Sequence, residues 1–89
     1  MRLKSNFVLR NVAGSWVVLP IADQALDFNG MLTLNQSGVL LWRALEQGGN
    51  RTTLASALTD VYDVSFEEAL ADVNAFLQKL YEAGCIEES

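Results

Sequence analysis

The sequence contains no histidine, the side chain that enzymes most often use as a general base and as a metal ligand. Its only cysteine, Cys85, lies between Gly84 and Ile86, with no basic neighbour that would activate the thiol. A glycine-rich phosphate loop is also missing, because Gly48-Gly49 follows an expected helix rather than opening one. These absences predict a protein that is not an enzyme, with no catalytic residues, no metal site and no cofactor.

The chain is also short of the features that mark secreted and membrane proteins. One cysteine cannot form an internal disulfide, which is typical of the reducing cytosol. No stretch approaches the roughly 20 apolar residues of a membrane span, and the basic start of the chain is not followed by a signal-peptide core. We therefore expect a cytoplasmic protein without a membrane partner. Its 89 residues, 51% of them hydrophobic, suit a single domain over residues 1–89.

Positive charge is scarce in the second half of the chain. Residues 44–89 hold nine of the eleven acidic residues but only two of the six basic ones, Arg51 and Lys79. Phosphate backbones are bound by clustered Lys and Arg side chains, so this distribution argues against a nucleic-acid partner. It suits instead a partner of positive charge, or simply a helical surface that keeps a small domain in solution.

Two strand-like segments open the chain, at residues 7–12 and 16–21. Ala13-Gly14-Ser15 joins them, and a three-residue connection that contains glycine is typical of a β-hairpin. Pro20 cannot donate a hydrogen bond to a neighbouring strand, so we expect it at the end of its strand or facing away from the sheet.

A second hairpin is predicted at Asn29-Gly30, the sharpest local signal in the sequence. Both residues tolerate the positive φ that a type I′ turn requires, so residues 25–28 should run antiparallel to residues 31–34. Asn35 follows at once and has the character of a helix N-cap. The strand at 31–34 thus leads directly into a helix, and its far edge has no evident partner in the sheet. Such an edge can pair with another chain.

Apolar residues recur at helical spacing from residue 36 onward, and three helices are expected. The first helix ends at Gly48-Gly49. Thr52 or Thr53 caps the second, shorter helix, which is followed by a connector at residues 62–64. The inward-facing residues of these two helices are Gly38, Leu41, Trp42, Leu45, Leu54, Ala55, Leu58 and Val61.

The third helix has clear signals at both of its ends. Ser65 and Glu68 have the spacing of a capping box, in which each side chain serves the first turn of the helix. The helix runs from about Phe66 to Ala83, and Gly84 lies where a left-handed C-terminal cap is expected. Its inward-facing residues are Ala69, Leu70, Val73, Phe76, Leu77 and Leu80.

These elements predict an α+β fold that is winged-helix-like, with a small antiparallel β-meander of three or four strands followed by three α-helices. The second and third helices have helix-turn-helix proportions, so a DNA-binding transcriptional regulator is one alternative for the function. Its recognition helix would carry Lys79 and no arginine beside Glu67, Glu68, Asp72 and Glu82, which would oppose the phosphates. A further alternative is an oligomerisation module, a homodimer formed through the free strand edge.

Several short motifs occur in this sequence in a characteristic order and spacing. They are Phe28-Asn-Gly30, Leu32-Thr-Leu-Asn35, Gly38, Leu41-Trp42, Arg51-Thr52, Tyr62-Asp-Val64, Asp72-Val73, Phe76, Leu80 and Gly84. Together they resemble the PqqD family, named for pyrroloquinoline quinone biosynthesis protein D, over most of the chain. Short PqqD-like proteins share these motifs widely, so the resemblance implies the role of the family rather than one biosynthetic pathway.

The resemblance implies a recognition element for ribosomally made, post-translationally modified peptides. Members of the family bind the leader segment of a precursor peptide and present it to a modifying enzyme, which for PqqD itself is a radical S-adenosylmethionine protein. The leader adds as a strand beside the last strand of the sheet, in a cleft closed by the third helix. The expected partners are therefore a leader peptide and a radical S-adenosylmethionine or other peptide-modifying enzyme.

The candidate peptide-binding residues come from the free edge and from the flank of the third helix. The strand at 31–34 carries apolar groups on both faces, more than a sheet covered on one side requires. This surplus would line a groove against the third helix, with charged side chains at the rim. The candidates are Met31, Leu32, Thr33, Leu34, Asp72, Ala75, Phe76 and Lys79.

Overall fold

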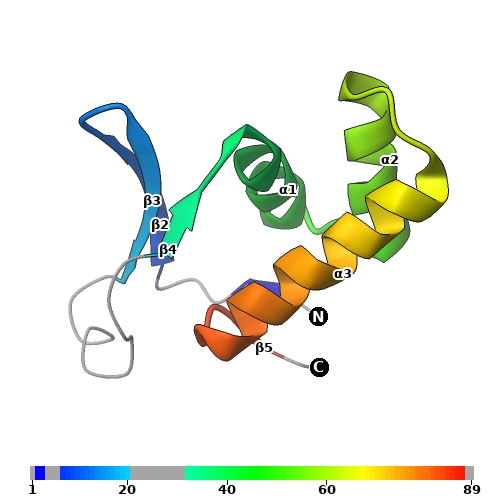
Figure 1. Cartoon of the computed structure of the whole chain (residues 1–89). Helices are drawn as coiled ribbons and strands as arrows, with labels where there is room; N and C mark the ends of the chain where they lie inside the picture. Colours follow the sequence, from blue (N-terminus) through cyan, green and yellow to red (C-terminus); the bar gives the residue numbers. More distant parts are fainter. Residues whose placement is uncertain (1, 4–6, 21–31, 88–89) are drawn as a thin grey trace.

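The computed structural model of the protein describes residues 2–3, 7–20 and 32–87. The elements are β1 (Arg2–Leu3), β2 (Phe7–Val12), β3 (Ser15–Pro20), β4 (Leu32–Leu34), α1 (Gln36–Glu46), α2 (Arg51–Val61), α3 (Phe66–Glu82) and β5 (Ile86–Glu87). Figure 1 shows the strands β2, β3 and β4 on one side of the molecule and α2 on the other, with α1 between them. The predicted α+β fold, antiparallel strands followed by three helices, is confirmed.

Over the described residues the main sheet has three strands in the order β2-β3-β4, all antiparallel. β3 therefore lies in the middle, and β4 pairs with it from Trp16 opposite Leu34 to Val18 opposite Leu32. Pro20 is the last residue of β3, as its missing N–H donor predicts. The expected hairpin at Asn29-Gly30, with its partner strand, lies outside the described residues.

The turn between β2 and β3 is tighter than the sequence suggests. Only Ala13 and Gly14 lie between the two strands, rather than a loop of three residues, because Ser15 already pairs with Val12. Ala13 has a φ of 52° and Gly14 a φ of 85°. Two successive residues with positive φ are the requirement of a type I′ turn, whose twist matches that of the flanking strands.

Side-chain caps begin all three helices. The Asn35 Oδ1 accepts a hydrogen bond from the Gly38 N–H at 2.8 Å, as predicted. The predicted cap of α2 is wrong: the Asn50 Oδ1 accepts the Thr53 N–H at 2.9 Å, so Asn50 is the cap rather than Thr52 or Thr53. Among the described helices, none combines the length and the apolar character needed to cross a lipid bilayer.

The cap of α3 forms one half of the predicted box, and the Glu68 carboxylate contacts the Ser65 hydroxyl rather than the Ser65 backbone N–H. The Ser65 Oγ accepts the Glu68 N–H at 3.1 Å and lies 3.2 Å from the Glu68 carboxylate, to which the hydroxyl donates. Gly84 has a φ of 80°, the left-handed conformation expected beyond the last turn.

One hydrophobic core joins the sheet to all three helices. The prediction that Val61 faces this core is wrong, because 62% of the residue is exposed where α2 ends. The other inward-facing helix residues of the prediction are buried, apart from a half-buried Leu70. The largest fully buried side chains are Trp42, Leu54, Leu80, Val18, Val73 and Cys85.

A second, two-stranded sheet joins the ends of the described chain. β1 pairs antiparallel with β5, with Arg2 opposite Glu87 and Leu3 opposite Ile86. The sequence predicts neither strand, since each has only two residues and neither shows an alternating pattern. Figure 1 shows β5 beside the C-terminal end of α3.

The turn at Ala13 gives a test of the backbone. Ala13→Asn is expected to raise the free energy of unfolding by about 1 kcal/mol, because asparagine tolerates the left-handed conformation better than alanine. Urea denaturation would measure it, with Ala13→Val as the control that should lower stability. Equal stability of the asparagine and valine variants would contradict the positive φ at this residue.

The cap of α2 can be tested in the same way. Asn50→Ala should lower the free energy of unfolding by about 1 kcal/mol, since the Thr53 N–H loses its acceptor. Thr52→Ala is the matched control and should stay within about 0.5 kcal/mol of the unchanged protein. A larger loss of unfolding free energy for Thr52→Ala than for Asn50→Ala would contradict the Asn50 cap and support the cap predicted from the sequence.

Candidate functional site

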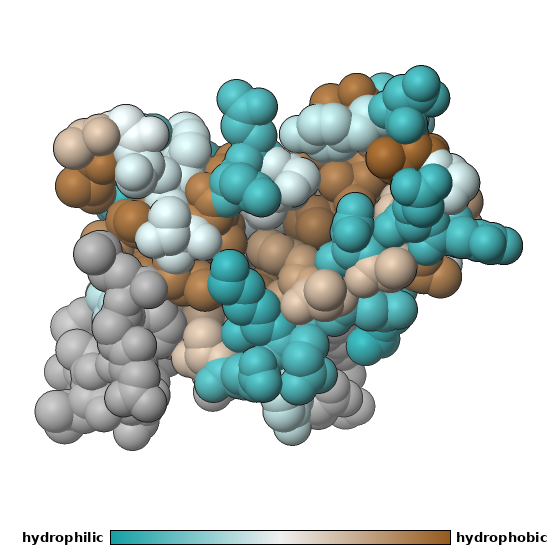
Figure 2. All heavy atoms as spheres, in the orientation of Figure 1, coloured by the Kyte–Doolittle hydropathy of each residue, from teal (hydrophilic) through white to brown (hydrophobic). Residues whose placement is uncertain are grey.

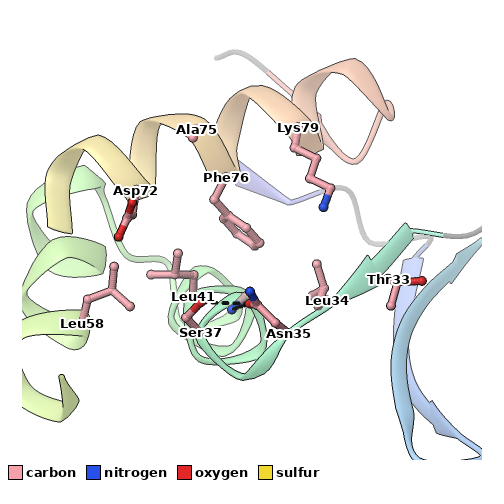
Figure 3. Close-up of a pocket in the computed structure, with 11 residues that line it drawn as sticks. Thr33, Leu34, Asn35, Ser37, Leu41, Leu58, Asp72, Ala75, Phe76 and Lys79 are labelled. Atoms are coloured by element: carbon pink, nitrogen blue, oxygen red, sulfur yellow. Dashed lines mark hydrogen bonds between the residues drawn. The ribbon is translucent and has the colours of Figure 1, made fainter. Parts of the chain in front are cut away.

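A groove with a volume of about 620 Å³ opens between β4, the first turn of α1 and α3 (Figure 3). We call it the β4–α3 groove. A cavity of this size is in the range of sites that hold ligands. Its lining residues are Thr33, Leu34, Asn35, Ser37, Gly38, Leu41, Leu58, Asp72, Ala75, Phe76 and Lys79.

One wall of the β4–α3 groove is the end strand of the sheet. β4 pairs with β3 along one edge, and no other described strand pairs with its second edge. In Figure 3 the groove lies to one side of β4 and the strands β2 and β3 lie to the other. The buried Leu34 reaches into the groove, while Thr33 is exposed. No described strand therefore occupies the backbone groups of this edge, which lie next to a hollow, and such groups are what strand addition requires.

The first turn of α1 continues this wall. Asn35 keeps the extended backbone of the strand, with φ −82° and ψ −177°, while its side chain already caps the helix. The Ser37 hydroxyl donates to the same Asn35 Oδ1 at 2.9 Å. Gly38 lets α1 begin close to β4, because a Cβ at this position would lie 3.2 Å from the Leu34 Cβ. The cap and the glycine together fix the angle between strand and helix.

The opposite wall is one face of α3. Asp72, Ala75, Phe76 and Lys79 are spaced as neighbours on a single helix face. Phe76 is only 9% exposed and points into the groove, whereas the other three side chains are exposed at its rim. Figure 3 shows Asp72 at the end near Leu58 and Lys79 at the end near the sheet.

The floor of the groove is apolar and its rim is polar. Leu41 from α1 and Leu58 from α2 are both buried and complete the floor with Leu34 and Phe76. Figure 2 shows apolar atoms in a hollow across this face of the molecule, with hydrophilic atoms on either side. This arrangement can bury apolar side chains of a ligand and hold its polar groups at the edge.

Two side chains supply the charge of the groove. Among the lining residues that the structure describes, Asp72 and Lys79 alone are ionisable, and they lie at opposite ends of the α3 wall. No group of three or more acidic or cysteine side chains in the described part of the chain is arranged to hold a metal ion. The groove thus offers a hydrogen-bonding edge, an apolar floor and two opposite charges, a set suited to holding an extended peptide.

The structure brings together most of the residues that the sequence singled out. Six of the eight candidates line the groove: Thr33, Leu34, Asp72, Ala75, Phe76 and Lys79. The side chain of Leu32 is instead buried in the core, so only its backbone belongs to the strand edge. Met31 lies outside the described residues.

Five of the described lining residues are not among the candidates predicted from the sequence. Asn35, Gly38 and Leu41 were assigned to the cap or to the inner face of α1, and Leu58 to the inner face of α2. A buried residue can face a groove with part of its surface, and helical periodicity does not distinguish the two positions. Ser37, next to the cap, carries no signal of its own.

Comparison with known proteins places this architecture among characterised folds. The family model described as coenzyme PQQ synthesis protein D (PqqD) matches residues 15–86. A solved structure described as TbiB1 in complex with the TbiA(beta) leader peptide has a TM-score of 0.80 and 20% sequence identity, over 100% of this chain and 98% of that one. Lasso peptide synthetase B1 complexed with the leader peptide has a TM-score of 0.78 and 23% identity, over 98% and 96%. No curated protein sequence matches the chain.

Proposed function

Because this chain belongs to the family of coenzyme PQQ synthesis protein D, we propose that it binds the leader segment of a ribosomally made precursor peptide. It presents the peptide to a separate modifying enzyme, a radical S-adenosylmethionine protein or another class. The observation that carries the proposal is the edge of β4 beside the β4–α3 groove, with which no described strand pairs. Two proteins with the same fold, each described in complex with a leader peptide, support it.

The edge and the floor have different tasks in such a complex. An edge of three residues offers only a few backbone hydrogen bonds, each worth about 1 kcal/mol. Association costs at least about 4 kcal/mol in lost freedom of motion, so these bonds alone do not hold a peptide. Apolar side chains buried against the floor must supply most of the affinity, and the edge sets the register of the bound strand.

The roles of the candidate residues follow from this division. The backbone of Leu32, Thr33 and Leu34 receives the peptide strand, while Phe76 and the Leu34 side chain contact its apolar residues. Ala75 leaves space for the peptide because its side chain is small and lies at the rim. Met31, the residue directly before β4 in the sequence, stays a candidate.

The charges of α3 disfavour the DNA-binding alternative. The exposed side chains of this helix include Glu67, Glu68, Asp72 and Glu82, and Lys79 is its one cation. In a major groove these carboxylates would lie near phosphates, and the repulsion would oppose binding. The proportions of the two helices alone do not define the function.

Calorimetric titration with synthetic leader peptides tests the proposal. The peptides are those of the short open reading frames that neighbour the gene of this chain. At least one should bind, and methylating the backbone nitrogens of its strand-forming residues should weaken binding, because a methylated nitrogen cannot donate to the β4 edge. Absence of binding by every peptide, or full affinity of the methylated one, would contradict the proposal.

A substitution at the rim tests where the peptide lies. Ala75→Trp should weaken peptide binding at least tenfold, or about 1.4 kcal/mol, because the indole fills the space over Phe76. Ala71→Trp is the matched control: Ala71 is also exposed on α3 but does not line the groove. Equal affinities of the two variants would place the peptide elsewhere.

A further inference from the structure

The α3 wall presents its side chains to the β4–α3 groove in a fixed order. Figure 3 shows Asp72, Phe76 and Lys79 along the groove, from the end near Leu58 to the end near Thr33. The order along the wall is therefore acidic, aromatic and basic. A peptide in the groove meets these three groups one after another, whichever way its chain runs.

The spacing of these groups matches alternate residues of an extended peptide. At 1.5 Å per helical residue, Asp72 and Phe76 are about 6 Å apart along the axis, and Phe76 and Lys79 about 4.5 Å. Side chains on one face of a strand repeat about every 6.6 Å. The long, flexible Lys79 side chain covers the remaining difference. Every second residue of the bound strand thus faces one member of the series.

A second recess continues the groove past Asp72. It has a volume of about 200 Å³ and is lined by Ser37, Leu58, Tyr62, Val64 and Asp72. Ser37, Leu58 and Asp72 also line the main groove, so the two hollows share a wall. Tyr62 is 36% exposed and Val64 half-buried, and both come from the connector between α2 and α3. A peptide that passes Asp72 therefore reaches an apolar surface beyond the end of the sheet.

We propose that the groove selects a peptide with an acidic, an apolar and a basic residue at alternate positions, followed beyond the basic residue by a second apolar residue. The acidic residue pairs with Lys79, the first apolar residue covers Phe76, and the basic residue pairs with Asp72. The second apolar residue lies against Tyr62 in the recess. This specificity rests on the proposed function and adds to it the chemistry of the peptide.

Selection from a displayed library of random peptides tests this pattern without knowledge of the natural leader. Binders to the Ala75→Trp variant are removed first, so that the peptides retained depend on the groove. The retained peptides should share the alternating acidic, apolar and basic positions and the added apolar residue. Retained peptides without charge at these positions would overturn the proposed specificity and leave the peptide-binding function in place.

Exchange of the two rim charges provides the decisive comparison. The double variant Asp72→Lys, Lys79→Asp should bind a peptide selected on the unchanged protein about tenfold more weakly, because both rim pairs become repulsive. A peptide with its own two charges exchanged should recover the affinity for the variant. Both residues are exposed, and thermal unfolding verifies that the variant is folded. Equal affinities of the double variant for the two peptides would overturn the charge pairing.

Two variants, each replacing one tyrosine, test the second recess. Tyr62→Ala should remove the preference for the added apolar residue, so that a peptide with alanine there binds as well as the selected one. Tyr81→Ala is the matched control, since Tyr81 is exposed on α3 but lines neither hollow. An unchanged preference in Tyr62→Ala would remove the recess from the site. A library that yields no groove-dependent peptide would overturn both this specificity and the proposed function.

Discussion

The change from strand to helix at Asn35 is the constraint on which the groove depends. This residue continues the extended backbone of β4, and its side chain satisfies the first turn of α1 through the Gly38 N–H. A loop at this point would let the strand edge and the helix move apart. Because the change takes one residue and Gly38 admits a close approach to Leu34, the edge of β4 is held against the floor of the groove.

Local signals predicted the helices well, because caps and apolar periodicity act within a few residues. Asn35, Ser65 and Gly84 behave as their types suggest. The errors also have physical causes. Threonine is a common N-cap residue, so Thr52 and Thr53 fit the local pattern. In the structure, however, the helix already begins after Asn50, whose side chain accepts the Thr53 N–H. The short β1–β5 pair depends on contact between distant ends of the chain, which no local pattern indicates.

The candidate site was predicted in part, and its missing residues have a physical reason. The resemblance to the PqqD family, now confirmed by the match over residues 15–86, predicted a site at the last strand and the third helix. It did not reveal Leu41 and Leu58, which bring α1 and α2 into the floor. Their apolar character fits core and groove equally, and only the packing of three helices distinguishes the two.

The position of α3 also explains how a fold with helix-turn-helix proportions can form a groove that suits a peptide. A DNA reader turns the outer face of its recognition helix to the solvent and covers it with basic groups. Here the outer face of α3 is acidic, and the face that carries Phe76 and Lys79 turns toward the edge of β4 with which no described strand pairs. The third helix therefore forms one wall of a groove, rather than an exposed helix that could enter a DNA groove. A narrow hollow with a strand at one side suits an extended chain, whose backbone and alternate side chains contact both walls together.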